Sequence, residues 1–259
     1  MRVLMIGDVV GRPGRKAVQL GLADLKKEYD FSLIVANGEN SSGGFGISGE
    51  TAAELFSYGV DILTTGNHIW NKREAFALLE KDKRVIRPAN YPPMLPGSGL
   101  VIFETKENYK IAVLNLSGRS FMPALDCPFR MVDEMLKGLQ GKVNAIVVDF
   151  HAEATSEKLA FGWHLAGRVA AVCGTHTHVQ TADERILPGG TAYITDMGMS
   201  GPRDSVIGTN ADIAIRRFIT QAPVRMEVAS GLFQFNGVII EIDETCGEAL
   251  SIDRVQQFE

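Results

Sequence analysis

Histidine and acidic residues recur in short polar segments, each placed directly after an apolar run. Four of the five histidines lie in three of these segments, Gly66-Asn67-His68, Asp149-Phe150-His151 and Gly174-Thr175-His176-Thr177-His178. Two acidic segments come earlier in the chain, Gly7-Asp8 and Gly38-Glu39-Asn40. Imidazole and carboxylate ligands together suit Mn, Fe, Zn, Ni or Co better than Ca. The pattern therefore predicts a centre that binds two metal ions.

The apolar runs before these segments are typical of buried strands. We expect strands at Val3–Ile6, Phe31–Ala36, Val60–Thr64, Ala145–Val148 and Val169–Cys173. Polar residues that repeatedly end buried strands converge on one rim of a sheet, which is where open α/β folds place their sites. The polar segments should therefore meet in space although they are far apart in the chain.

Helical patterns alternate with the early strands. We expect helices near Lys16–Lys27, from an N-cap at Ser48 to about Phe56, and near Lys72–Glu80. Strand–helix–strand alternation indicates parallel strands.

The later part of the chain is richer in strands. Leu100–Thr105 and Lys110–Leu116 flank a short polar turn and predict an antiparallel hairpin. Further strands are expected at Ala192–Thr195, Leu232–Ile242 and Leu250–Val255, with one helix near Asp212–Ile219. Parallel units joined to late antiparallel strands predict an α/β fold with two mixed sheets packed face to face and helices outside. No linker or repeat divides the sequence, so residues 1–259 are expected to form a single domain.

Composition and charge exclude several classes of protein. The net charge is −5, so we expect no basic face and no stable binding of nucleic-acid polymers. No apolar stretch approaches the roughly 20 residues of a membrane helix, and the N-terminal apolar run is too short for a signal peptide. The three cysteines lack metal-binding spacing. A cytoplasmic protein is expected.

The individual site residues also have plainer interpretations. Asp8 could cap a helix or a turn, and asparagine after a strand, as at Asn40 and Asn67, is often a turn former. His176 and His178 alternate, so an extended backbone would point them to opposite sides. Either a loop re-aims one of them or each serves a different metal.

Two further features are interpreted as structural. His164 has no ligand spacing to the other histidines. Gly7–Gly14 matches neither a Walker A loop nor a dinucleotide-binding motif, so it is expected to turn the chain, although Arg12 could meet an anion.

The ordered set of polar segments resembles the calcineurin-like metallophosphoesterases. The glycine-rich segment after Glu39-Asn40, together with Asp196–Pro202 and Ser205–Gly208, resembles their bacterial YmdB-like branch. This resemblance spans the chain and implies a four-layer αββα metallophosphoesterase sandwich.

The chain departs from the superfamily pattern at three positions. Val10 stands where a histidine ligand is common, Glu39 replaces the usual aspartate, and Ile69 replaces the acid that usually follows the Asn-His pair. Asn40 is the nearest residue that could fill the place of the absent histidine. What orients His68 is left open by the missing acid.

The resemblance also implies roles for the ligands. One divalent ion, Fe or Mn, would be held by Asp8, Glu39, Asn40 and His178, and a second by Glu39, Asn67, His151 and His176. Glu39 would bridge the two ions. A hydroxide between the metals would attack phosphorus, and His68 would stabilise charge or protonate the leaving oxygen.

The implied activity is hydrolysis of small phosphodiesters, notably 2′,3′-cyclic nucleotides. A phosphomonoesterase, or a nucleotide-sensing regulatory protein with weak turnover, is the alternative. Trp70, Ser200 and Arg203 are candidate substrate contacts. The sequence leaves a homo-oligomer open.

Overall fold

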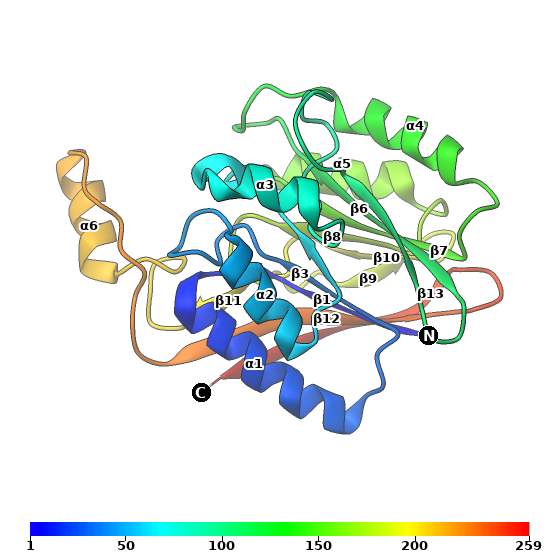
Figure 1. Ribbon diagram of the computed structural model, residues 1–259, viewed down its shortest axis with the longest axis horizontal. Coiled ribbons are helices and arrows are strands. Elements are labelled where there is room, and N and C mark those ends of the chain that lie inside the picture. The colour runs from blue at the N-terminus through cyan, green and yellow to red at the C-terminus, as the bar shows by residue number, and fades with distance from the viewer. Residues whose placement is uncertain (259) are drawn as a thin grey trace.

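Two β-sheets pack face to face between outer layers of helices in the computed structural model, which describes residues 1–258 (Figure 1). In the first sheet the order is β2 (Asp8–Val9), β11 (Met199–Pro202), β12 (Phe233–Ile242), β1 (Arg2–Ile6), β3 (Leu33–Asn37) and β4 (Ile62–Thr64), with β13 (Ala249–Phe258) also paired to β12. In the second it is β5 (Leu100–Glu104), β6 (Lys110–Ser117), β7 (Ala145–His151), β8 (Ala171–Thr175), β10 (Thr191–Ile194) and β9 (Arg185–Leu187). Both sheets are mixed.

Successive side chains of a strand point to opposite faces of the sheet, so each strand contributes to two separate layers of the core. In β1, Val3 and Met5 pack into the core between the sheets, whereas Leu4 and Ile6 pack into the core under the helices. The first sheet is covered by α1 (Gly11–Glu28), α2 (Gly49–Tyr58) and α3 (Glu74–Lys81), and the second by α4 (Pro128–Leu139) and α5 (Thr155–Leu165). The predicted αββα sandwich is confirmed.

Parallel pairing brings the polar segments to one end of the sandwich. β1, β3 and β4 are parallel in the first sheet, and β6, β7, β8 and β10 are parallel in the second. At this end Asn37 Nδ2 donates to Asp149 Oδ2 at 3.0 Å, which joins the end of β3 to β7 across the two sheets.

Several local predictions are confirmed. Ser48 caps α2 by accepting from Thr51 N, and β5 pairs antiparallel to β6 as the predicted hairpin. β7 runs on to His151, so this residue ends the strand rather than following it.

The glycine-rich segment before α1 was interpreted wrongly as a turn. The helix begins at Gly11 rather than near Lys16, so Gly11–Gly14 form its first turn. A Cβ at Gly14 would lie 2.3 Å from Ser200 O, so this glycine lets the helix pack closely on β11.

Helix α6 (Ala211–Thr220) stands apart from the layers, at the left of Figure 1. It belongs to an arm whose two strands meet at an antiparallel bridge between Thr209 and Val228. Asn210 N also donates to Glu227 O at 2.9 Å. Ala214 is the one buried residue of this helix. Among residues 1–258, no helix is long and apolar enough to cross a membrane.

Candidate metal centre

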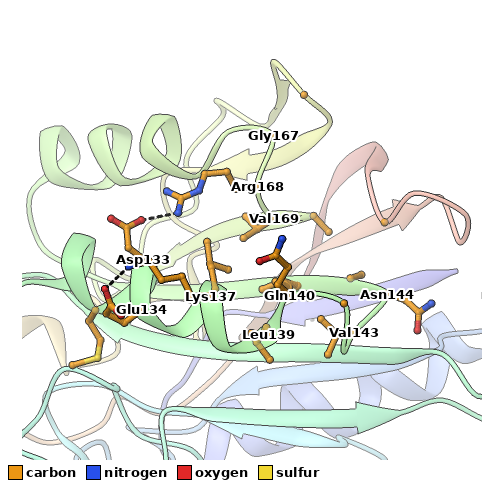
Figure 2. A pocket seen from close by; sticks show the side chains of 18 of the residues that line it. Asp133, Glu134, Lys137, Leu139, Gln140, Val143, Asn144, Gly167, Arg168 and Val169 are labelled. Atoms are coloured by element: carbon orange, nitrogen blue, oxygen red, sulfur yellow. Dashed lines mark hydrogen bonds and ion pairs between the residues drawn. The ribbon is translucent and has the colours of Figure 1, made fainter.

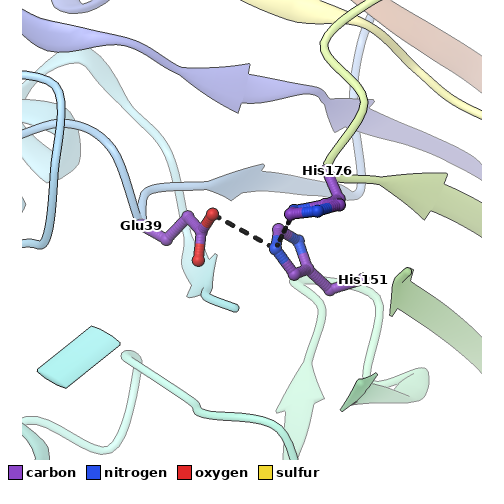
Figure 3. A group of neighbouring side chains, drawn as sticks. All are labelled: Glu39, His151 and His176. Carbon is purple, nitrogen blue, oxygen red and sulfur yellow. Dashed lines mark hydrogen bonds and ion pairs between the residues drawn. The ribbon is translucent and has the colours of Figure 1, made fainter. Parts of the chain in front are cut away.

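Ligand atoms from four segments converge on His151 Nε2. It lies 3.1 Å from Glu39 Oε1, 3.1 Å from His176 Nδ1 and 2.8 Å from Asn67 Oδ1. Figure 3 shows Glu39, His151 and His176 pointing toward one another from different strand ends. Glu39 and His151 are fully buried. One ring nitrogen cannot hydrogen-bond well to three such neighbours at once, whereas a cation among them would satisfy all four.

A second group of candidate ligand atoms lies near Glu39 and is linked to it through Asn40. Asn40 Nδ2 is 3.3 Å from Glu39 Oε1 and 3.2 Å from His178 Nε2, and His178 Nε2 is 3.7 Å from Asp8 Oδ1. Asp8 Oδ1 and Asn40 Oδ1 are buried with no hydrogen-bond partner in the described part of the chain. Buried oxygens of this kind are costly unless something binds them. A half-turn of the Asn40 amide would bring its oxygen to the position that its nitrogen takes between Glu39 and His178.

A buried hydrogen-bond chain orients His151. Thr175 Oγ1 donates to Asp149 Oδ1 at 2.6 Å, so its lone pairs accept from His151 Nδ1 at 2.9 Å. This places the Nδ1 proton away from the centre and leaves Nε2 as the ligand atom. The sequence suggested Asp149 only as a neighbour of His151, and it gave no signal for Thr175.

The outer nitrogens of the other two histidines also face acceptors. His178 Nδ1 is 2.8 Å from the carbonyl oxygen of Ile207, and His176 Nε2 is 3.2 Å from Glu153 Oε2. Because these oxygens only accept, each outer nitrogen carries the proton, and the inner nitrogen is free to bind a metal. Glu153, two residues after His151, was missed in the sequence.

Positive φ angles re-aim both of the alternating histidines, whereas the sequence had left open whether a loop re-aims one of them or each serves a different metal. φ is 101° at His176 and 66° at His178, a region that non-glycine residues rarely adopt. The buried ion pair between Lys158 Nζ and Asp196 Oδ2, at 2.6 Å, holds this turn, because Asp196 Oδ2 also accepts from Thr177 N and Oγ1. Lys158 further donates to the carbonyl of Thr175.

The strongest electrostatic interaction among the residues of this centre is the buried ion pair between Glu39 and His151. Burial opposes ionisation of Glu39 and His151, but their mutual attraction and hydrogen bond lower the pKa of Glu39 to about 2 and raise the pKa of His151 to about 9. Burial raises the pKa of Asp8 to about 6. Burial and the neighbouring His151 charge lower the pKa of His176 to about 3.

Close packing leaves no room for a side chain at Gly66. A Cβ there would lie 2.2 Å from His151 Nε2 and 2.4 Å from Glu39 Oε2. The glycine before Asn67 is therefore required by the proximity of the ligands.

His68 takes part in the centre through its backbone, while its ring faces a cavity. His68 N donates to Glu39 Oε2 at 2.9 Å, which fixes the second oxygen of that carboxylate. The ring packs edge-on against Phe45, with centroids 5.0 Å apart. This aromatic contact holds the imidazole where the sequence left its orientation open.

The cavity beside the centre has a volume of about 590 Å³, the size of a small-molecule site. Ligand residues form one wall, and the loop after β3 and the α6 arm form others. Its lining includes Glu39, Asn40, His68, His176 and His178, with Phe45, Glu153, Ile207, Arg217, Phe218, Glu227 and Val228.

The three candidate substrate contacts lie outside the described lining of this cavity. Trp70, in the short 3-10 helix Ile69–Asn71, packs its ring against Phe76 and Tyr91. The Ser200 hydroxyl is buried and faces a backbone carbonyl of β12. The Arg203 guanidinium lies over an aromatic ring of β13. Packing against the fold, rather than exposure at the site, accounts for all three.

His164 is structural, as expected. Its Nε2 lies 3.0 Å from Asp133 Oδ1, on the outer face of the second sheet. A larger hollow of about 1090 Å³ opens there (Figure 2), and two ion pairs lie among its charged side chains, Asp133 with Arg168 and Glu134 with Lys137. Among residues 1–258, no group of side chains that could hold a metal ion lies in this hollow.

Comparison with known proteins places the whole chain beside one family. A family model described as YmdB-like protein matches residues 4–255. A Bacillus subtilis protein named 2′,3′-cyclic-nucleotide 2′-phosphodiesterase is 48% identical over 256 residues, which cover 98% of this chain and 96% of the relative.

Two solved structures share the fold throughout. A hypothetical protein from Thermus thermophilus has a TM-score of 0.94 and 41% identity, with both chains fully covered. A structure described as a novel phosphatase from Mycoplasma pneumoniae also has a TM-score of 0.94, with 37% identity over 100% of this chain and 94% of the other.

Proposed function

This chain belongs to the YmdB-like family, and on that premise we propose that it is a metal-dependent phosphodiesterase whose substrates are small phosphodiesters, namely 2′,3′-cyclic nucleotides. The name of the Bacillus subtilis relative supports this substrate class. The observation that carries the proposal is the convergence of buried ligand atoms on both sides of Glu39 Oε1, next to a cavity of mononucleotide size. Because both sheets supply ligands, we also propose that residues 1–259 act as one metallophosphoesterase domain.

The ligand atoms divide into two sets that share Glu39. We assign Asp8, Glu39, Asn40 and His178 to one ion, and Glu39, Asn67, His151 and His176 to the other. The sets contain nitrogen and oxygen donors and no thiolate, which suits Mn or Fe. When bound, two divalent cations would supply positive charge for the phosphoryl oxygens and lower the pKa of a water molecule. Their charge of +4 exceeds the −2 of Asp8 and Glu39.

His68 is the protein's own group for the chemistry. Its ring faces the cavity while its backbone binds Glu39, so the side chain is free to act on substrate. We assign it to stabilise developing charge or to donate a proton to the leaving oxygen of the ester.

The charge around the cavity favours a small anion over a polymer. Glu153 and Glu227 lie on its walls and would repel an extended phosphate backbone. In the described lining, Arg217 is the single lysine or arginine. We therefore propose that nucleic-acid polymers are not bound stably, and that the protein acts on small molecules in the cytoplasm.

A panel of phosphoesters tests the activity. Manganese-loaded protein is given 2′,3′-cyclic AMP, 3′-AMP and bis-p-nitrophenyl phosphate, and the products are separated by chromatography. We expect the two diesters to be cleaved and the monoester to be left largely intact. Faster cleavage of 3′-AMP would favour the phosphomonoesterase instead. Binding of the cyclic nucleotide without product in a single turnover would favour the nucleotide sensor.

A further inference from the structure

Two exposed phenylalanines face the same cavity from separate parts of the chain. We propose that Phe45, in the loop after β3, and Phe218, on α6, hold the nucleobase of the substrate between them. This inference rests on the proposed function, since it names how that site recognises a nucleotide.

Phe218 is placed for a ligand rather than for the protein core. Its side chain is 72% exposed, yet it lines the cavity with Ala214, Arg217 and Gln221. Ala214, Arg217 and Phe218 lie on one face of α6, three and four residues apart, and Gln221 follows the helix directly. That face of α6 is therefore the one turned toward the metal centre.

Phe45 lies beside the group assigned to the chemistry. Its ring is 38% exposed and its centroid is 5.0 Å from that of His68. In a 2′,3′-cyclic nucleotide the base lies one ribose ring from the phosphate. A phosphate at the metal ligands, with its leaving oxygen near His68, would bring the base to the aromatic side of the cavity.

The two walls meet at the base of the arm. A Cβ at Gly44 would lie 2.7 Å from Val228 Cγ2, so the loop that carries Phe45 packs directly on the arm. Ile207, whose carbonyl oxygen lies 2.8 Å from His178 Nδ1, also lines the cavity near this base. Arm, loop and metal ligands are therefore fixed relative to one another at this point.

Aromatic faces bind bases of any type, and stacking on one of them contributes roughly 5- to 150-fold in affinity. Ile219 is the matched control, because it is 76% exposed on the same helix and is not among the described lining residues. If the exposed apolar side chains of α6 served only to bind a protein partner, replacing Phe218 and replacing Ile219 would have the same effect on the kinetics with substrate.

The test compares two substrates that share a cyclic phosphate. Manganese-loaded wild type, Phe218→Ala, Phe45→Leu and Ile219→Ala are assayed on 2′,3′-cyclic AMP and on glycerol 1,2-cyclic phosphate, which has no base. We expect Phe218→Ala to raise KM for the nucleotide by about tenfold, with kcat changed little. Phe45→Leu should also raise this KM, and it should lower kcat on both esters because Phe45 packs against His68. Kinetics of Phe218→Ala on the glycerol ester, and both reactions of Ile219→Ala, should stay as in wild type.

We call the proposed binding of the base between Phe45 and Phe218 the base clamp. It would be overturned if Phe218→Ala impaired the kinetics on both substrates equally, or on neither of them. The proposed phosphodiesterase activity would be unaffected by either result. If wild type cleaves neither ester, the proposed function fails, and the clamp is then decided by binding. Equilibrium dialysis would compare 3′-AMP with glycerol 2-phosphate. The clamp predicts a preference for 3′-AMP in wild type that Phe218→Ala removes, and equal affinities in wild type would refute it.

Discussion

At the scale of single residues, His151 and Glu39 form a buried ion pair, and the proposed metal would have to convert both residues into ligands. The pKa of His151 is raised to about 9, so this ring holds a proton at neutral pH. The pKa of Glu39 is lowered to about 2, so this carboxylate is already ionised. Only the neutral imidazole can bind a metal, and the proton of His151 must therefore leave.

Metal binding should accordingly release about one proton per chain from His151. As pH rises toward 9, protons compete less for Nε2, so the apparent affinity for Mn²⁺ should rise by about tenfold per pH unit. Titration calorimetry between pH 6 and 8.5, in buffers of different ionisation enthalpy, measures both quantities. An affinity that does not change over this range, with no proton released, would show that no protonated His151 competes with the metal.

His68 differs from the other histidines of the site, because in the described part of the chain its ring makes no hydrogen bond to any of the candidate metal ligands. His68→Ala should keep its metals and lose kcat by about 10²–10⁴-fold, the usual contribution of a general acid. Stopped assays and elemental analysis on the same preparation measure the two effects. His164→Ala, at a structural histidine on the outer face of the second sheet, should retain activity. A His68→Ala protein that is fully active or metal-free would refute the assignment.

At the scale of elements, the turn after β8 depends on an ion pair supplied by α5. Lys158 and Asp196 are almost fully buried, and together they hold the Thr177 turn between two ligands. Lys158→Met would leave a buried carboxylate without its partner, which typically costs 3–5 kcal/mol. Thermal unfolding should show a markedly lower Tm, with weaker Mn²⁺ binding. Lys137→Met, at an exposed pair with Glu134, should change Tm little.

The sequence predicted well which polar side chains come together, because each of them lies at or just after the end of a recognisable strand. It could not place α6 over the site, although a helix near Asp212–Ile219 was expected. The arm is positioned by the bridge between Thr209 and Val228, a pairing of distant residues that local periodicity does not encode. The sequence could not show that Trp70 packs on Tyr91 outside the lining of the cavity, because this contact depends on tertiary structure.

At the scale of the whole molecule, two sheets bring the candidate ligands to one end of the sandwich, and the alternating strands and helices predicted this arrangement. The extent of α1 was mistaken because glycines such as Gly14 signal a turn locally, whereas here they permit close packing on β11. The formal net charge of −5 leaves the molecule without a surplus of positive charge for a polyanion.

Long RNA should therefore be a poor substrate. We expect kcat/KM for 2′,3′-cyclic AMP to exceed that for cleavage of a long RNA, with little dependence on salt for the small ester. Polymer binding through phosphates weakens steeply as salt rises, because counterions are released. Parallel assays at low and moderate salt decide the question. A faster reaction on RNA that falls steeply with salt would show that the cavity is not the main recognition site.

Metal counting tests the shared-ligand centre most directly. Wild-type protein is reconstituted with Mn²⁺, freed of excess metal by gel filtration and measured by elemental analysis against protein concentration. Asn40→Ala removes a ligand from one set, whereas Glu39→Gln removes charge from both, so Glu39→Gln should lose more metal. We expect close to two Mn²⁺ ions per wild-type chain. One ion per chain, or equal retention in Glu39→Gln and wild type, would contradict the two-metal centre bridged by Glu39.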